Sequence, residues 1–379
     1  MIRTLILSVI PALVLAQRHR VNINTETPAG LLLQSIGQET QDAGRKLALM
    51  EEFAKKYSKH DSVAWVLDQL VASYLKANQF DQVLASGQQL LAVDPDDVAA
   101  AHSCLKAAEG KKDTALITQW AGTTSKLARK AAGAPQPKEE DAVENWKNMV
   151  DYAKQVDTYT EYSLYAATVA SADPAQRIQL RSALIAQNPQ SQYVPQLNTP
   201  YFYALRQANQ NDKAVEFAES ILEKDQSNED MLLAVADSYL TRKTSPEKVV
   251  AYGNKLAELM SSKPKPEGVS DDDWNKRKTL LMGLGYWMAG VTHGAANKFA
   301  ECDEVLRKAL PLVEGNDQLK AQALFYLGLA NYKMGDSKKD KKMIADALRF
   351  NVQCSAIKSP FQGQAVKNAT VIRQQYGLK

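Results

Sequence analysis

Glycine and proline are scarce in this sequence, at 18 and 14 of 379 residues. Because these two residues dominate tight turns, their scarcity argues against a turn-rich β fold and favours long helices. Cysteine is also rare, and Cys104, Cys302 and Cys354 do not make the even, dense set of a disulfide-stapled domain. We expect buried free thiols, because Cys104 and Cys302 fall where a helical repeat needs a small buried residue. One disulfide with one thiol left over is the alternative.

An excess of charge of one sign is absent as well. Lys and Arg number 46, and Asp and Glu number 43, so the net charge is +3. A nucleic-acid-binding protein normally carries a clustered basic face. The basic run Lys338, Lys339, Lys341 and Lys342 is short and typical of a solvated loop followed by a helix start. The sequence therefore predicts no nucleic-acid partner.

The sequence also lacks the common catalytic patterns. None of its four histidines, His19, His60, His102 and His293, lies three or four residues from another histidine or cysteine, the spacing of a metal site on a helix. It contains no G-x-S-x-G motif, no Walker phosphate loop and no H-E-x-x-H motif. We therefore expect no enzyme activity, no cofactor and no metal site.

Residues 1–16, MIRTLILSVIPALVLA, differ from the rest of the chain. Arg3 supplies a positive start, an apolar stretch follows over 5–15, and Val14 and Ala16 form a small-x-small site. This order is typical of a secretory signal peptide. An uncleaved anchor is the weaker alternative, because about 20 apolar residues are needed to span a bilayer. We expect an exported protein, periplasmic or secreted, that does not span the membrane after cleavage.

A repeated pair of helices is the main pattern in the rest of the chain. In residues 64–97, one apolar face of a first helix is formed by Leu67, Leu70, Val71 and Tyr74. A second apolar face begins at residue 80, after a short break. It ends at Pro95, because proline cannot continue the backbone hydrogen-bond ladder. The segment predicts a helix-turn-helix of 34 residues.

This unit resembles the tetratricopeptide repeat (TPR) family, and with the N-terminal segment it resembles a secreted or periplasmic bacterial TPR-containing protein. The residues at the family's spacing are Leu67, Leu70, Val71, Tyr74, Val83, Gly87 and Pro95, with Val71 in place of the usual glycine. Residues 321–335 match better, with Leu327-Gly328 at the centre. Weaker units recur over 28–57, 98–131, 158–191, 195–228, 229–263 and from residue 278. The resemblance implies an all-α fold, an α-solenoid that winds as a right-handed superhelix of TPR-like helix-turn-helix repeats.

Two stretches rich in proline and charge, 131–140 and 261–272, interrupt the repeats and are expected to be extended loops. Ser270 is a good N-cap for a helix that follows the second loop. The domains expected from the sequence are a signal peptide over 1–16, N-terminal repeats over 17–131, a linker over 132–142 and a repeat array over 143–379 with a loop at 261–272.

The resemblance also implies a function, because the concave groove of TPR proteins commonly holds an extended peptide or a partner helix. We expect a non-catalytic interaction scaffold or adaptor of the cell envelope that binds a protein or peptide partner in this groove. Aromatic residues and arginine commonly anchor interfaces. Residues of this kind, and one lysine, lie one position off the packing face of the first helices: Trp65, Tyr159, Tyr162, Tyr203, Arg206, Tyr286, Phe325, Tyr332 and Lys333.

Two alternative functions stay open. A helical-toroid enzyme acting on glycans also stacks helix pairs, and its candidate residues are His102 and His293 with nearby tyrosines. A histidine beside a carboxylate in a closed cleft would favour this enzyme. A small-molecule or lipid-binding shell would instead use the tyrosine-rich units between residues 157 and 203, and a ligand that co-purifies with the protein would favour it.

Overall fold

The computed structural model describes residues 18–378. These residues form seventeen α-helices and one short 3-10 turn, and they contain no β-strand. The chain divides into two compact units, of which unit 1 ends at Ala208 and unit 2 begins at Asn209. The all-α fold expected from the sequence is confirmed. The expected signal peptide, residues 1–16, lies outside the described residues.

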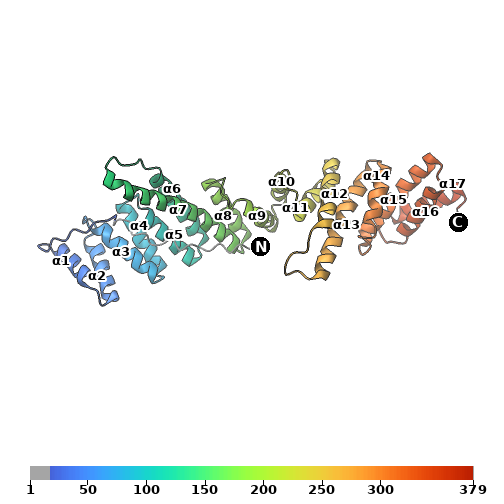
Figure 1. Cartoon of the computed structure of the whole chain (residues 1–379). Coiled ribbons are helices and arrows are strands. Elements are labelled where there is room, and N and C mark those ends of the chain that lie inside the picture. The colour runs from blue at the N-terminus through green and yellow to red at the C-terminus, as the bar shows by residue number, and fades with distance from the viewer. Residues whose placement is uncertain (1–17, 379) are drawn as a thin grey trace. The chain divides into compact units, whose positions relative to one another are not determined.

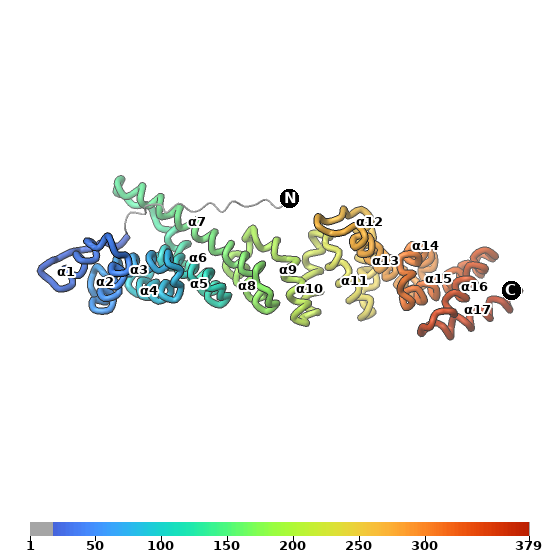
Figure 2. The backbone as a smooth tube through the Cα atoms, turned by 90° about the horizontal axis from the view of Figure 1, so that it is seen from below, coloured from blue at the N-terminus to red at the C-terminus, as the bar shows by residue number. Residues whose placement is uncertain are grey.

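In unit 1 each helix packs against the next one along the chain (Figures 1 and 2). Its elements are α1 (Pro28–Gln38), α2 (Ala43–Lys56), α3 (Val63–Lys76), α4 (Phe80–Val93), α5 (Val98–Lys111), α6 (Thr114–Ala132), α7 (Glu140–Ala170), α8 (Pro174–Gln187), the 3-10 turn η1 (Pro195–Leu197) and α9 (Asn198–Gln207). The core between the helices is apolar, with Leu33, Phe53, Leu90 and Leu164 almost completely buried.

Unit 2 follows the same chain-order packing. Its helices are α10 (Asn211–Leu222), α11 (Glu229–Arg242), α12 (Pro246–Ser262), α13 (Asp271–Ala295), α14 (Phe299–Ala309), α15 (Asp317–Lys338), α16 (Lys341–Ser355) and α17 (Gln362–Tyr376). As expected, the side chain of Ser270 caps α13, since its hydroxyl accepts a hydrogen bond from the Asp273 backbone N–H.

The helices are organised as hairpins, and the first helices of successive hairpins also touch. In unit 1, α3 contacts α5 and α5 contacts α7, while in unit 2 α11 contacts α13 and α13 contacts α15. The first helices of each unit therefore share one face. A hairpin repeat with this pairing is the architecture that the 34-residue period predicts, and residues 18–378 form an all-α array of helical hairpins. The handedness of the superhelix stays a prediction.

Two local features explain why the hairpins form. The turn inside a hairpin uses one residue with left-handed backbone, and this recurs in both units at Asn78, Lys112, Lys243, Asn297 and Lys339, with φ between 54° and 58°. Such a residue ends the first helix and reverses the chain within a few residues. Helices also start on side-chain caps, mostly from aspartate or asparagine.

Small residues allow the helices to approach closely. A Cβ atom on Gly87 would lie 2.3 Å from the Cys104 sulfur, and one on Gly328 would lie 2.4 Å from the Asn351 side-chain nitrogen. Both separations are shorter than a Cβ atom normally makes, so a larger residue at either position would force the facing side chain to shift. Gly328 therefore lies where α15 and α16 meet.

The two expected loops join consecutive helices. Residues 133–139 connect α6 to α7, and these two helices pack against each other. The indole N–H of Trp146 donates to the Ala134 carbonyl at 2.9 Å and ties this loop to α7. Residues 263–270 connect α12 to α13. The division between the units falls at residues 208 and 209, inside the region 143–379 that the sequence analysis treats as one array. No helix of residues 18–378 has the length and apolar character needed to cross a membrane.

Candidate functional site

The first helices of unit 2 enclose a cleft of about 760 Å³. Side chains from α11, α13 and α15 line it, together with the turn that leads into α12. Aromatic rings of Tyr239, Trp287 and Tyr326 form much of its wall, and Asp237 and Lys243 place one charge of each sign beside it. Mostly apolar pockets of about 300–1,000 Å³ with a few polar groups are the usual sites for ligands.

The glycine-rich helix α13 shapes this cleft. A Cβ atom on Gly285 would lie 2.4 Å from the carbonyl oxygen of Gly253, so α12 and α13 pack backbone against backbone. A Cβ atom on Gly294 would lie 2.4 Å from the Tyr326 ring, which therefore rests directly on α13. Further along α13, the small and exposed Ala295 lines the cleft. Small residues thus bring the walls together and leave the space between the aromatic rings open.

The ring of Tyr239 is held by a hydrogen-bond network. Its hydroxyl donates to Glu219 Oε2 at 2.7 Å and accepts from Lys248 Nζ at 3.2 Å, and Lys248 also pairs with Glu219. Burial alone would raise the pKa of Glu219, but the hydrogen bonds from Lys248 and Tyr239 outweigh it, and the pKa is lowered. The carboxylate therefore stays charged, and the network orients one wall of the cleft.

Trp287 lines the cleft, but its indole nitrogen lies beneath the surface. The indole Nε1 is buried and has no hydrogen-bond acceptor within residues 18–378. A buried donor without an acceptor costs about 1–3 kcal/mol. A ligand in the cleft cannot reach this atom unless the surrounding side chains move.

None of the sequence candidates in unit 2 is among the residues that line the cleft. Tyr286 and Phe325 are half-buried and pack against the apolar core of α13–α16. The residues that follow them, Trp287 and Tyr326, are the ones in the cleft wall. On α15, the Tyr332 hydroxyl bonds to Gln375 Oε1 at 3.0 Å, and Lys333 is exposed.

In unit 1, the candidates Tyr159 and Tyr162 belong to an aromatic cluster on the face of the first helices. Ring centroids are 5.0 Å apart for His102 and Tyr159, 6.2 Å for Tyr159 and Tyr162, and 6.4 Å for Tyr162 and Tyr165. Tyr193 stacks on Tyr165 at 5.0 Å. The Tyr159 hydroxyl donates to Glu109 Oε2 at 2.7 Å, and burial raises the pKa of Tyr159. The aromatic side chains therefore contact one another and cover this face of the first helices.

The other three sequence candidates lie apart from this cluster. Trp65 on α3 is half-buried against the core of α1–α4. Tyr203 on α9 is 38% exposed. Arg206, one turn further along α9, is exposed and places its guanidinium 6.0 Å from the ring centroid of Phe202. The structure therefore brings Tyr159 and Tyr162 together and leaves the remaining candidates at separate places.

Of the two histidines proposed for an enzyme, His102 is buried and His293 is half-buried. His102 Nδ1 lies 3.3 Å from the Tyr152 hydroxyl, and burial, helped by Lys106, lowers the pKa of His102 to about 3. Burial also lowers the pKa of His293. The ion pairs between histidine and carboxylate in residues 18–378 are made by His19 alone. Neither His102 nor His293 forms such an ion pair in these residues, and Glu301 is the carboxylate that acts on the pKa of His293.

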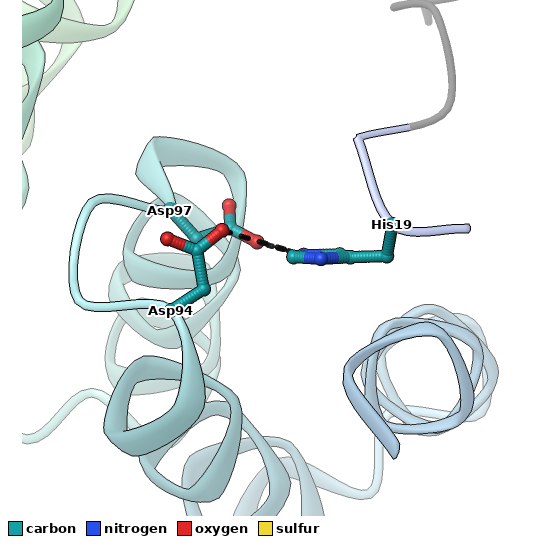
Figure 3. Close-up of side chains that lie close together, drawn as sticks. All are labelled: His19, Asp94 and Asp97. Carbon is teal, nitrogen blue, oxygen red and sulfur yellow. Dashed lines mark hydrogen bonds and ion pairs between the residues drawn. The ribbon is translucent and has the colours of Figure 1, made fainter. Parts of the chain in front are cut away.

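A group that the sequence analysis missed lies in unit 1, where His19, Asp94 and Asp97 converge (Figure 3). His19 Nε2 is 2.9 Å from Asp97 Oδ2 and 3.9 Å from Asp94 Oδ2. Asp97 also caps α5, because its Oδ1 accepts from the Ala100 N–H at 2.9 Å. The spacing of 78 residues between His19 and Asp97 has no sequence signature, and only the cap position of Asp97 could be predicted.

The three cysteines are free and buried, as expected. Burial raises the pKa of Cys104 and of Cys302 to about 12, and that of Cys354 to about 11. The thiolate is the reactive form of cysteine, so these thiols are inert in the folded protein.

Comparison with known proteins adds the following. No family model and no curated protein matches the sequence. Among solved structures, the crystal structure of the P58(IPK) TPR domain is 11% identical, over 83% of this chain and 99% of that chain, with a TM-score of 0.27. A structure of Naa15/Naa10 bound to HypK-THB is 12% identical, over 93% of this chain, with a TM-score of 0.19. This chain spans 62% of the length of that second chain.

Proposed function

We propose that this protein is a non-catalytic interaction scaffold that binds an extended peptide segment of a protein partner in the cleft of α11, α13 and α15. The observation that carries the proposal is the cleft itself, with three aromatic residues in its wall and a volume of about 760 Å³. Aromatic anchors in a concave site supply most of the binding free energy in many interfaces. The resemblance to the TPR family supports the same function.

The polar groups of the cleft favour a peptide as the ligand. Polar lining side chains such as Thr241 and Gln322 can bond to the main-chain carbonyl that every residue of a peptide provides. Asp237 and Lys243 can contact the polar or charged side chains on either side of an apolar anchor residue. An extended segment with one aromatic or large aliphatic side chain meets all these features together.

The proposal includes export to the cell envelope, which rests on the signal-like order of residues 1–16. Expression in a bacterial host followed by cell fractionation and N-terminal sequencing of the recovered protein tests it. The expected product is found outside the cytoplasm and begins at residue 17. Protein that stays in the cytoplasm and begins at residue 1 would contradict export without affecting the cleft.

Panning a random peptide library displayed on phage against the immobilised full chain tests peptide binding. Ala295 is exposed and lines the cleft, so Ala295→Trp fills it without disturbing the core. The matched control is Ala300→Trp on α14, because Ala300 is also exposed but does not line the cleft. Peptides enriched on the wild type are expected to lose at least tenfold in affinity for Ala295→Trp and to keep their affinity for Ala300→Trp.

Two results would overturn the peptide proposal. One is a library that shows no enrichment on the wild type over Ala295→Trp. The other is a set of peptides that binds both proteins equally well. Native mass spectrometry of the purified protein addresses the alternative of a binding shell, because a bound lipid or metabolite that is displaced in Ala295→Trp would assign the cleft to a small molecule.

A further inference from the structure

His19, Asp94 and Asp97 bring three metal-binding side chains together from separate segments of the chain (Figure 3). Their ligand atoms, one imidazole nitrogen and two carboxylate oxygens, all lie within 4.8 Å of one another. His19 is 9% exposed and Asp97 is 2% exposed, while Asp94 is partly open to solvent. The three side chains are therefore mostly shielded from solvent, and the group is accessible on the side of Asp94.

The charges around this group are not balanced. Asp94 forms an ion pair with both nitrogens of the Arg18 guanidinium edge, at 2.5 and 2.8 Å, and Asp96 pairs with Lys130. The buried carboxylate of Asp97 contacts His19, which is charged only when protonated, and the Ala100 N–H. The Arg18 charge also acts on Asp97, but it is paired directly with Asp94. A buried carboxylate is costly unless a positive charge is close to it. A bound cation would supply that charge permanently.

We propose that His19, Asp94 and Asp97 bind one divalent transition-metal ion, with Zn²⁺ as the best match. An imidazole nitrogen with carboxylate oxygens suits zinc, whereas Mg²⁺ and Ca²⁺ select all-oxygen sites. Zinc bonds to nitrogen and oxygen of about 2.0–2.1 Å in a tetrahedron place the ligand atoms about 3.3 Å apart. The separations of 2.9 and 3.9 Å from His19 Nε2 bracket this value, so small side-chain movements complete the geometry. A water molecule takes the fourth position.

The ion would fasten the segment before α1 to the rest of unit 1. This segment already contacts α3, because the Asn22 N–H donates to the Ser62 hydroxyl at 3.0 Å. The ion would strengthen the attachment at the turn between α4 and α5, where Arg18 and His19 already contact Asp94 and Asp97. The proposed zinc site therefore acts as a structural clip. It does not depend on peptide binding in unit 2.

Isothermal titration of the full chain with ZnCl₂ tests the proposal. The variants are His19→Gln and Asp97→Asn, since glutamine keeps a polar side chain and asparagine keeps the cap on α5. The matched control is His60→Gln, which removes another histidine of unit 1 that is not part of the group. We expect one Zn²⁺ per chain, at least tenfold weaker binding in both site variants and unchanged binding in His60→Gln. Circular dichroism without metal checks that each variant is folded.

Two further measurements distinguish a structural Zn²⁺ site from adventitious binding of Zn²⁺. Co²⁺ in place of Zn²⁺ should give the visible absorption of a tetrahedral site in the wild type and lose it in His19→Gln. Saturating Zn²⁺ should slow tryptic cleavage after the exposed Arg20 in the wild type but not in His19→Gln. The proposal is overturned if His19→Gln binds Zn²⁺ like the wild type, if Mg²⁺ or Ca²⁺ binds as tightly, or if Zn²⁺ leaves the cleavage rate unchanged.

Discussion

The two units differ in what covers the shared face of their first helices. In unit 1, Tyr159, Tyr162 and Tyr165 contact one another in sequence along α7, and His102 and Tyr193 extend the cluster. In unit 2, the equivalent face keeps a cleft of about 760 Å³. Both faces are built from the same hairpin repeat. The hairpin repeat therefore sets the positions of the helices in each unit. The size of the side chains beside the packing face decides whether the face of the first helices is filled or carries a cleft.

The first-helix faces of the two units also differ in how their polar groups are paired. The unit 1 cluster satisfies its own polar groups in part, as in the bond from Tyr159 to Glu109. The unit 2 cleft instead has polar side chains such as Thr241 and Gln322 in its lining. A filled face stabilises the protein, and an open face with aromatic and polar groups is suited to binding. The predictions below test this distinction from the largest expected effect to the smallest.

Gly285→Ala should cause the largest loss of stability, because its Cβ atom would collide with the Gly253 carbonyl oxygen at 2.4 Å. The backbones of α12 and α13 must then move apart, which disrupts the cleft as well. We expect the free energy of unfolding to fall by about 3 kcal/mol. Urea unfolding followed by circular dichroism measures it. A loss below about 0.5 kcal/mol would show that the close backbone packing is not needed.

The buried His102 should make unit 1 sensitive to acid. Its pKa is about 3 in the folded protein against an ordinary value of 6.5, so the unfolded chain takes up a proton first as the pH falls below 6.5. The contribution of His102 to the free energy of unfolding is fully present above pH 6.5 and is lost progressively as the pH falls to about 3. Between pH 7 and pH 4.5 this amounts to about 2–3 kcal/mol.

The comparison of wild type with His102→Gln isolates this contribution from that of the carboxylates. Urea unfolding at pH 7 and pH 4.5 should show a smaller loss in His102→Gln than in the wild type. Equal losses in the two proteins would mean that His102 is not the titrating group.

Tyr159→Phe should cost about 1 kcal/mol, because it removes the hydroxyl that donates to Glu109 and leaves that carboxylate partly unsatisfied. Tyr332→Phe in unit 2 is the control, because the hydrogen bond from Tyr332 to Gln375 is exposed. Its removal should cost only a few tenths of a kcal/mol. Thermal unfolding of both variants tests the contrast, and equal costs would argue against a stabilising role for the tyrosine cluster.

Gly122→Ala should have the smallest effect and the opposite sign. Gly122 is exposed in the middle of α6, and an added Cβ atom meets nothing within 4 Å. Alanine lowers the conformational entropy of the unfolded chain and should stabilise the protein by about 0.5–1 kcal/mol. The same urea experiment as for Gly285→Ala gives the comparison. A destabilised Gly122→Ala would show that the available space is not what separates these two glycines.

Much of the fold follows from the sequence because helices leave a periodic pattern. The apolar face of residues 67–74 predicts α3, and Ser270 predicts the start of α13. Gly328 marks a close helix contact, because an added Cβ atom would lie 2.4 Å from the Asn351 side-chain nitrogen. These features depend on residues within a turn or two of each other, which the sequence shows directly.

The candidate site could be predicted only in part. The first helices are the elements that line the cleft, but on α13 the wall uses Trp287 and not the expected Tyr286, and on α15 it uses Tyr326 and not Phe325. One residue on a helix corresponds to a rotation of about 100°, which is smaller than the width of an apolar face. The meeting of His19 with Asp94 and Asp97 depends on the path of an extended segment, for which no periodic pattern exists.

The buried thiols give this protein a set of internal probes that need no engineering. Cys104 lies in α5 of unit 1, while Cys302 and Cys354 lie in α14 and α16 of unit 2. Since each thiol reacts only when its surroundings open, the rate of alkylation at each cysteine reports how often that part of the array opens. Mass spectrometry of labelled peptides therefore yields separate opening free energies for the two units of one unmodified chain.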